Sequence, residues 1–575
     1  MVNGTLISVL GTRVECDSTS DALLYMSDLG DIRRKDYVNL DRTARAVAVW
    51  LREHCAPGDR VLLLHPAGLE FSSAFFGSCY AGTIAVPAPV PGRYQHERRR
   101  LTGIARNAGV RVVLTDRASL PQVEKWVAEA GLSDVVCRAT DDEMGDPGAW
   151  RPPEISPDDI ALLQYTSGST SEPKGVMVSH RNLLSNVDAI MTAAGVDSGC
   201  RSGGWIPHYH DMGLIGLLLT GVLRGRGFAF MAPMAFLRRP HHWLRMMQDL
   251  DVNMSAAPDF GYDLCVRRVT DEQLAELDLS GLRAVVNGSE PIRSANLTRF
   301  CDRFAAAGFR AEALLPMYGL AEATLMVTGT SGRPPLRRSF DVAALERGRL
   351  VADDQGRELV GCGGPNEVDV AIVDPRTRAT LPSGRIGEIW VRGGSVAGGY
   401  WDNPDATAAT FDARTSGGDG PYLRTGDLGG LHDGDLYVTG RLKDTLVLHG
   451  RNLHPHDIED VVRTEHEELH GLHGAVFTVP GAHDEEQLVV VHEIRTTWGE
   501  QRLAEVAASM KQTVTREFGT AVGSVVLVRP SAVRRTTSGK IQRSAMRDLY
   551  LADELEPVLR SEDAQLTAAR AVVAR

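Results

Sequence analysis

The chain lacks both closely spaced cysteines and long apolar stretches. Its eight cysteines are spread over 575 residues and form no CxxC pair. Disulfide frameworks and zinc sites need cysteines at close, regular spacing, so we expect buried thiols in a reducing compartment. The most apolar window, 215–223, ends at Arg224. That window is far shorter than the roughly 20 apolar residues that a membrane-spanning helix needs, so no stable membrane insertion is expected.

The chain also lacks an excess of positive charge. It has 62 Lys and Arg against 74 Asp and Glu, which gives a net charge of −12. This balance argues against nonspecific binding of nucleic acid or of an anionic membrane. The first residues, MVNGTLISVLGTRVE, have no basic leader and no long apolar core, so we expect no signal peptide and a cytoplasmic protein.

The alternation of short apolar runs with helical patterns predicts the fold class. Runs rich in β-branched residues at 60–65, 83–87 and 110–114 read as buried strands, and 41–54 reads as an amphipathic helix. Such alternation predicts an α/β domain with layered, largely parallel sheets. A chain of this length is too long for one ordinary core, so we expect at least two domains.

The pattern changes near residue 440. Strand-like runs at 474–480, 486–494 and 524–530 flank a helical stretch at 501–518, which predicts a small α+β unit. We therefore predict a large N-terminal domain over 1–440 and a small C-terminal domain over 441–575. The junction TGRLKD, at 439–444, is the predicted hinge.

The segment YTSGSTSEPKG, at 165–175, concentrates short hydrogen-bond donors. Five hydroxyl side chains and two glycines let a phosphate approach the backbone closely, and a lysine adds a mobile positive charge. The lysine precedes the last glycine, so this is no Walker A loop. A Ser/Thr-rich surface turn is the alternative interpretation of so short a motif. The residues predicted to hold a triphosphate are Thr166, Ser167, Gly168, Ser169, Thr170, Ser171, Lys174 and Gly175.

Further motifs follow in a fixed order along the chain. They are GWIPHYHDMGLIG at 204–216, NGSEP at 287–291, YGLAEAT at 318–324, YLRTGD at 422–427, GRLKD at 440–444 and RRTTSGKIQR at 534–543. Together with 165–175, this ordered set resembles the adenylate-forming superfamily, which includes acyl-CoA synthetases, luciferases, peptide-synthetase adenylation domains and fatty acyl-AMP ligases. The resemblance covers the chain from about residue 20 to about residue 550.

The resemblance implies that ATP and Mg²⁺ are bound. Tyr318, followed by Gly319, would stack on adenine, and Asp427 would accept hydrogen bonds from the ribose diol beside Arg441. Glu322 and Thr170 would hold Mg²⁺, which commonly takes one or two protein oxygens. The backbone groups implied for the adenine pocket belong to Gly288, Ser289 and Glu290.

The implied reaction is attack of a carboxylate on the α-phosphate of ATP, with pyrophosphate leaving. Lys540 would reach from the small, mobile domain into the site, with Lys443 at the hinge and Lys174 beside the pyrophosphate. Both reactants are anionic, so catalysis would rest on positioning and charge neutralisation. His210 falls near the carboxylate and the α-phosphate, whereas His208 is expected to be a buried, hydrogen-bonded imidazole. The implied catalytic residues are thus Lys540, His210, Thr170 and Glu322.

Several segments resemble the fatty acyl-AMP ligases in particular. These are HDMGLIG at 210–216, 231–244 and 256–269, and they make Met212, Phe236 and Phe260 the candidate acyl-pocket residues. Asp259 stands where the resemblance leads us to expect asparagine, which changes the expected polarity of the pocket.

The stretch 331–361 resembles the insertion that separates acyl-AMP ligases from acyl-CoA ligases. In the family it restrains the small domain. It implies a fatty acid substrate and, as acceptor, the phosphopantetheine thiol of a separate holo acyl carrier protein, in lipid, lipopeptide or polyketide biosynthesis.

Two alternatives stay open at this point. One is a fatty acyl-CoA ligase, and the other is a non-catalytic nucleotide-binding or scaffold protein. The presence of Thr170, Glu322, Asp427 and Lys540 argues against the second. The sequence leaves open the acyl chain length, the pathway and the oligomeric state.

Overall fold

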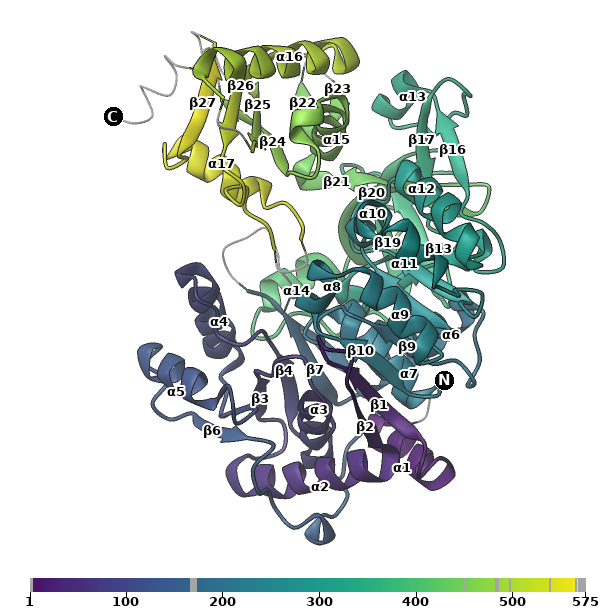
Figure 1. Cartoon of the computed structure of the whole chain (residues 1–575), viewed down its shortest axis with the longest axis vertical. Coiled ribbons are helices and arrows are strands. Elements are labelled where there is room, and N and C mark those ends of the chain that lie inside the picture. The colour runs from purple at the N-terminus through teal and green to yellow at the C-terminus, as the bar shows by residue number, and fades with distance from the viewer. Residues whose placement is uncertain are drawn as a thin grey trace.

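The computed structural model describes residues 4–165, 173–448, 451–480, 486–495, 498–536, 539–563 and 566. In Figure 1 the C-terminal elements form a small unit above a larger body built by the rest of the chain. Among the described residues, no helix is both long and apolar enough to cross a bilayer.

A six-stranded sheet lies at the base of the larger body (Figure 1). Its strand order is β6-β5-β3-β4-β7-β8, and every neighbouring pair is parallel except β7 and β8. The strands predicted at 60–65, 83–87 and 110–114 are β3, β4 and β5. The elements are α1 (Leu6–Cys16), α2 (Tyr37–His54), β3 (Arg60–Leu63), α3 (Glu70–Ala81), β4 (Ile84–Pro87), α4 (Gln95–Ala108), β5 (Val112–Thr115), α5 (Leu120–Glu129), β6 (Val136–Ala139), β7 (Ile160–Tyr165) and β8 (Gly175–Ser179).

A seven-stranded sheet packs against the six-stranded sheet. Its strand order is β13-β12-β11-β9-β10-β1-β2, and only β2 is antiparallel to its neighbour. The predicted α/β class with layered sheets is confirmed. Its elements are β1 (Asp21–Met26), β2 (Ile32–Asp36), α6 (His180–Ala194), β9 (Ser202–Gly204), the π-helix η2 (Met212–Leu219), α7 (Thr220–Leu223), β10 (Phe228–Met231), α8 (Pro233–Arg238), α9 (His241–Asp249), β11 (Met254–Ala257), α10 (Asp259–Arg268), α11 (Asp271–Ala275), β12 (Ala284–Asn287), α12 (Ser294–Phe304) and β13 (Leu314–Pro316).

Alternation along the strands gives this sheet two apolar faces. Met254 and Ala256 of β11 face the core shared with the six-stranded sheet. Ala257 belongs to the core on the opposite face, where Trp205 stacks on Phe236 with ring centroids 3.9 Å apart. Both faces are therefore covered, as parallel sheets require.

An antiparallel sheet, β18-β19-β20-β21, completes the larger body. The stretch 331–361 holds an antiparallel hairpin of β16 and β17 with a short helix between the strands. The elements are β14 (Tyr318–Gly319), η5 (Ala321–Ala323), β15 (Met326–Thr328), β16 (Arg337–Phe340), α13 (Val342–Glu346), β17 (Arg357–Val360), β18 (Val368–Val373), β19 (Gly387–Gly393), α14 (Pro404–Phe411), β20 (Leu423–His432) and β21 (Asp435–Arg441).

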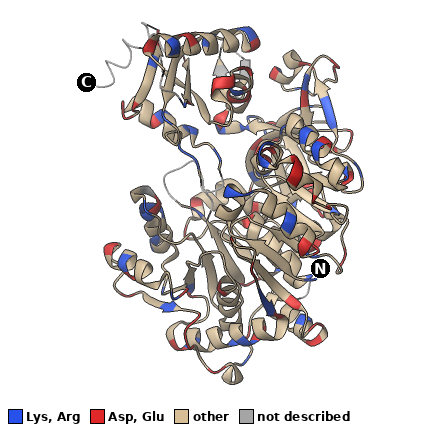
Figure 2. Cartoon of the chain, in the orientation of Figure 1, with Lys and Arg blue, Asp and Glu red and all other residues tan. Residues whose placement is uncertain are grey.

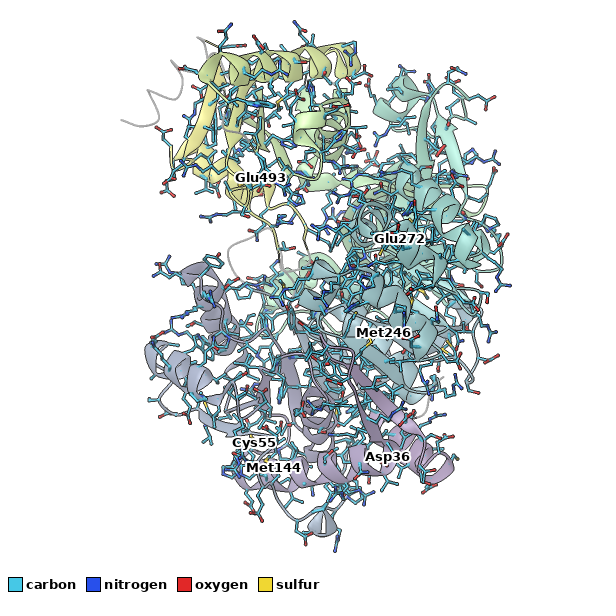
Figure 3. The ribbon with its side chains drawn as sticks, in the orientation of Figure 1. Asp36, Cys55, Met144, Met246, Glu272 and Glu493 are labelled. Carbon is cyan, nitrogen blue, oxygen red and sulfur yellow. The ribbon has the colours of Figure 1, made fainter. Side chains whose placement is uncertain are left out.

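The C-terminal unit has apolar cores of its own. Leu488 and Val490 of its central strand face α15 and α16, whereas Val489 and Val491 face α17. Figure 3 shows Glu493 in this unit and Met246 inside the larger body. The unit consists of β22 (Leu446–Leu448), β23 (Arg451–Leu453), α15 (Pro455–Glu465), β24 (Gly474–Pro480), β25 (Glu486–Glu493), α16 (Glu500–Phe518), β26 (Val522–Val528), α17 (Arg543–Leu551) and β27 (Pro557–Glu562), and the domain boundary near residue 440 stays a prediction.

The stacked pair of Trp205 and Phe236 gives a stability prediction. Because Phe236 is fully buried, Phe236→Ala should lower the free energy of unfolding of the larger body by about 3–5 kcal/mol. Leu237→Ala is the matched control, since Leu237 is 36% exposed. Calorimetry should show a lower unfolding temperature for the first variant only, and equal shifts would contradict the packing role.

Candidate functional site

A cavity of about 850 Å³ lies between the larger body and the C-terminal unit. Its wall combines residues from both. Tyr165 precedes the hydroxyl-rich residues and Lys174 follows them, and both line the cavity. Tyr318 and Glu322 come from the segment after β13, and Lys540 comes from the C-terminal unit. The structure thus brings residues separated by several hundred positions to one cavity.

The hydroxyl-rich segment is described only at its two ends. The predicted residues Thr166, Ser167, Gly168, Ser169 and Thr170 lie outside the described part of the chain. Of the flanking residues, Tyr165 ends β7 and Gly175 begins β8 opposite it.

Gly175 and Lys174 are placed by aromatic neighbours. A Cβ on Gly175 would come 2.9 Å from the Tyr165 ring, so a glycine is needed for these strands to pack. Lys174 lines the cavity, with its Nζ 5.0 Å from the centre of the Tyr400 ring. The positive charge of Lys174 therefore lies at the cavity, next to the end of β7 and the beginning of β8.

Asp427 is held from two sides. The Tyr318 hydroxyl donates to Oδ2 at 2.8 Å, and Nε of Arg441 donates to Oδ1 at 3.0 Å. The second contact follows from the sheet register, because Asp427 on β20 pairs with Arg441 on β21. The charge of Asp427 also raises the pKa of Arg441. Each carboxylate oxygen has a second lone pair, so the group can still accept hydrogen bonds from a ligand.

Glu322 is oriented by a residue that the sequence analysis missed. Oε1 of Glu322 accepts a hydrogen bond from the Tyr400 hydroxyl at 2.8 Å, and both residues line the cavity. The same tyrosine ring lies beneath Lys174. The only sequence signal for Tyr400 is its place after two glycines in GGYW, at 398–401.

Of the three residues predicted at the adenine pocket, two line the cavity and one lies behind its wall. Gly288 and Ser289 line the cavity, and a Cβ on Gly288 would come 3.1 Å from the carbonyl oxygen of Met317. Glu290 does not line it. Its Oε1 accepts the backbone N–H of Phe260 at 2.7 Å, and burial together with the charge of Asp259 raises its pKa to about 7.

Lys540 lies at the cavity wall and is hydrogen-bonded to Thr536. Its backbone N–H donates to Oγ1 of Thr536 at 3.1 Å, and its carbonyl accepts the Thr536 N–H at 2.8 Å. Burial, reinforced by the charge of Arg441, lowers the pKa of Lys540, although Asp211, Asp427 and Glu290 oppose that shift. The ammonium group is thus desolvated, and the charges of one arginine and three carboxylates act on it in opposite directions.

His210 and Asp211 form a pair at the start of the π-helix η2. Nδ1 of His210 lies 2.7 Å from Oδ1 of Asp211, which also accepts the backbone N–H of Met212 at 2.7 Å. Burial opposes the charge of Asp211, but His210 and Lys540 hold the pKa of that carboxyl below its usual value. Asp211 was not singled out from the sequence, where only the His-Asp dipeptide could have indicated it.

His208 is buried as predicted. Its Nε2 lies 3.0 Å from the carbonyl oxygen of His65, and its ring stacks on Phe71 at 3.9 Å. Burial lowers the pKa of His208 to about 4. It is therefore a neutral, packed imidazole.

The apolar wall of the cavity differs from the predicted one. Met212 lines the cavity, but Phe236 and Phe260 do not, because both rings pack on Trp205. Apolar residues of the seven-stranded sheet, of α6 and η2 and of the segment after β13 instead line part of the cavity, which we call the apolar arm. The residues of this arm are Ile190, Gly216, Met254, Ala256, Val286, Met317, Leu325 and Met326, which the sequence offers only as ordinary core positions.

Lys443 lies immediately after β21, in the short helix η6 (Leu442–Asp444), and also lines the cavity. Burial and the charge of Arg441 lower the pKa of Lys443. Its position joins the larger body to the C-terminal unit, and its role as a hinge stays a prediction.

Comparison with known proteins gives a consistent result. The family model described as AMP-binding enzyme matches residues 13–401. The chain is 39% identical to the medium-chain-fatty-acid–[acyl-carrier-protein] ligase JamA of Moorena producens, over 96% of each chain, and 37% identical to the ligase TtuA of the same description from Teredinibacter turnerae, over 95% and 93%. A solved structure from work on fatty acyl-adenylate ligases of E. coli and L. pneumophila superposes with a TM-score of 0.86 at 30% identity, covering 95% of this chain and 97% of that one.

The charges around Lys540 give a prediction about its titration. Asp211 raises the pKa of Lys540, so Asp211→Asn should lower that pKa further. The measurement is the pH dependence of Lys540 modification by an amine-specific reagent, followed by peptide mass spectrometry. Asp263→Asn, at a carboxylate that pairs with Arg267 and Arg299 elsewhere in the larger body, is the control. A midpoint that stays constant or rises in Asp211→Asn would contradict the arrangement.

Proposed function

Because this chain belongs to the AMP-binding enzymes, and within them to the fatty acyl-AMP ligases, we propose that it activates a fatty acid with ATP. The products are an acyl-adenylate and pyrophosphate. The acyl group then passes to the phosphopantetheine thiol of a separate holo acyl carrier protein, in lipid, lipopeptide or polyketide biosynthesis. The observation that carries this proposal is one cavity lined by Lys540, by Tyr318 and Arg441, which both bind Asp427, and by an apolar arm.

The nucleotide occupies the polar part of the cavity. Tyr318 stacks on the adenine, with Gly288, Ser289 and Gly319 lining its pocket. Asp427, whose two oxygens are already oriented by Tyr318 and Arg441, accepts hydrogen bonds from the ribose hydroxyls. This placement is supported by the fixed geometry of Asp427, because a buried, oriented carboxylate selects a diol better than a mobile carboxylate does.

Glu322 suits a magnesium ion. Mg²⁺ prefers hard oxygen ligands and few of them, and Glu322 presents a carboxylate at the cavity wall with one oxygen fixed by Tyr400. In this proposal Glu322 and Thr170 hold Mg²⁺, which when bound would neutralise phosphate charge. Lys174, on the same side of the cavity, steadies the pyrophosphate.

In the reaction, a carboxylate oxygen of the fatty acid attacks the α-phosphorus. A new oxygen–phosphorus bond forms as the bond to the β-phosphate oxygen breaks, and pyrophosphate leaves with the electron pair. Lys540 places its positive charge where negative charge accumulates, in a desolvated site where that charge acts strongly. His210, oriented by Asp211, lines the cavity beside the reacting groups.

The apolar arm holds the acyl chain. Its lining has apolar side chains from β11, β12, α6 and η2, which suits a saturated hydrocarbon tail. Gly216 keeps the arm open, because a Cβ there would come 3.0 Å from Cδ2 of Leu325. The arm thus separates the tail from the polar groups that handle the phosphates.

The hairpin of β16 and β17 supports a carrier protein as acceptor. Both oxygens of Asp457 on α15 accept hydrogen bonds from the Arg357 guanidinium on β17. This ion pair ties the C-terminal domain, proposed as 441–575, to the N-terminal domain, proposed as 1–440, and disfavours the rotation that would admit CoA. A fatty acyl-CoA ligase is the second candidate.

The direct test is incubation with ATP, Mg²⁺ and a series of straight-chain fatty acids, with either CoA or a holo acyl carrier protein. We expect acyl-adenylate and pyrophosphate with medium-length acids, and acyl transfer to the carrier. Lys540→Ala should slow adenylation roughly 10²–10³-fold, the usual effect of removing a charge-stabilising donor. Rapid acyl-CoA formation would favour the second candidate, and absence of pyrophosphate release with every acid would overturn the proposal.

Gly216 gives a test of the acyl arm. Gly216→Leu should fill the arm and lower kcat/KM for the longest accepted acids by roughly tenfold or more relative to shorter ones. Gly11→Leu is the matched control, because Gly11 also lies in a helix but a Cβ there meets nothing within 4 Å. Equal loss for all chain lengths would place the acyl chain elsewhere.

A further inference from the structure

Beyond the residues that touch substrate, the structure contains a chain of charged groups between the two units. We propose that Arg293 is a positioning residue for adenylation. It fixes the helix α15 of the C-terminal unit against the larger body, and α15 in turn holds the loop that carries Lys540. This inference rests on the proposed role of Lys540.

Arg293 is anchored in the larger body by Asp259, the residue that stands in place of the expected asparagine. Asp259 is fully buried. Its Oδ1 accepts the backbone N–H of Arg293 at 3.2 Å, and its Oδ2 lies 3.5 Å from Nη1 of the same arginine. Asn287 and Asn296 also donate to this carboxylate. A buried carboxylate needs such partners, so Arg293 is held in place immediately before the first residue of α12.

The other side of the Arg293 guanidinium faces the C-terminal unit. Its Nε lies 2.7 Å from Oδ1 of Asp460 on α15. The side chain of Arg293 is only 33% exposed, so this pair is less screened than a surface ion pair. One arginine therefore bridges two carboxylates, Asp259 in the larger body and Asp460 in the C-terminal unit.

The same helix is connected directly to the lysine loop. Glu459, next to Asp460, accepts two hydrogen bonds from Arg543, from Nε at 2.7 Å and from Nη2 at 2.6 Å. Arg543 begins α17 and follows Lys540 by three residues. The residues on either side of Lys540 are joined by a hydrogen bond from the Gln542 N–H to the carbonyl of Arg534, at 2.9 Å. A shift of α15 therefore shifts the position of Lys540.

Two attachments on one helix restrict its rotation more than one does. Asp457 and Asp460 are three residues apart, so they lie on the same face of α15. The first binds Arg357 of the hairpin and the second binds Arg293. Figure 2 shows acidic and basic residues interspersed over both units. Loss of Arg293 leaves α15 free to pivot about the remaining pair.

The test separates adenylation from transfer. Arg293→Ala, Asp460→Ala and the double variant are compared in pyrophosphate exchange and in transfer of the acyl group from supplied acyl-adenylate to a holo carrier protein. We expect each single variant to lower kcat of adenylation roughly fivefold to tenfold, with little change in KM for ATP. The double variant should lose less than the product of the two single losses, because the Arg293–Asp460 contact is removed by either substitution alone. Transfer should be unchanged or faster.

Arg303→Ala is the matched control. Arg303 lies on α12, its side chain is 28% exposed, close to the 33% of Arg293, and it pairs with Asp271 inside the larger body. It should leave both half-reactions at wild-type rates. If Arg293→Ala fails to fold because Asp259 loses its partner, Asp460→Ala still tests the proposal, since it leaves the Arg293–Asp259 contact in place.

Three outcomes would overturn the positioning role. Wild-type adenylation in Arg293→Ala and Asp460→Ala, with Lys540→Ala inactive, would reject it while leaving the proposed function intact. Equal loss of adenylation and transfer would indicate a general structural defect instead. Absence of pyrophosphate exchange in the wild-type protein would overturn both the proposed function and this inference.

Discussion

The desolvated charge of Lys540 is the constraint on which the rest of the site depends. An ammonium group loses hydration energy at a cavity wall, and this loss lowers its pKa. Asp211, Asp427 and Glu290 oppose the shift. These carboxylates come from η2, from β20 and from the loop after β12, so the charge balance is assembled only when three parts of the larger body meet the C-terminal unit.

Charge pairs connect the two units, whereas the interior of each unit is apolar. The C-terminal unit buries its own apolar residues on both faces of β25. It therefore needs no shared core with the larger body, and charge pairs at Arg357 and Arg293 align it instead. Such pairs give a defined geometry without a shared apolar core. That combination fits the proposed mobility of the C-terminal unit.

The division of the cavity into a polar part and an apolar arm follows from strand alternation. Successive side chains on β11 point to opposite faces, so Met254 and Ala256 reach the arm while Ser255 binds Trp243 behind the sheet. The π-helix η2 forms the opposite wall and places Gly216 toward Leu325. Asp211 is the N-cap residue of that same helix and pairs with His210, so one segment lines the apolar arm and orients His210.

The sequence by itself determined the α/β class, because hydrophobic periodicity depends only on local order. It also determined the family and its chemistry, through motifs whose residue types are adapted to phosphate, ribose and carboxylate. The tertiary structure alone decided which side chains meet. Tyr318 and Asp427 are 109 positions apart, and Arg293 and Asp460 lie on different units. It also decided that Phe236 packs on Trp205, that Tyr400 orients Glu322 and that Asp259 binds Arg293. These contacts depend on helix and strand packing across long sequence separations, on which local residue patterns carry no information.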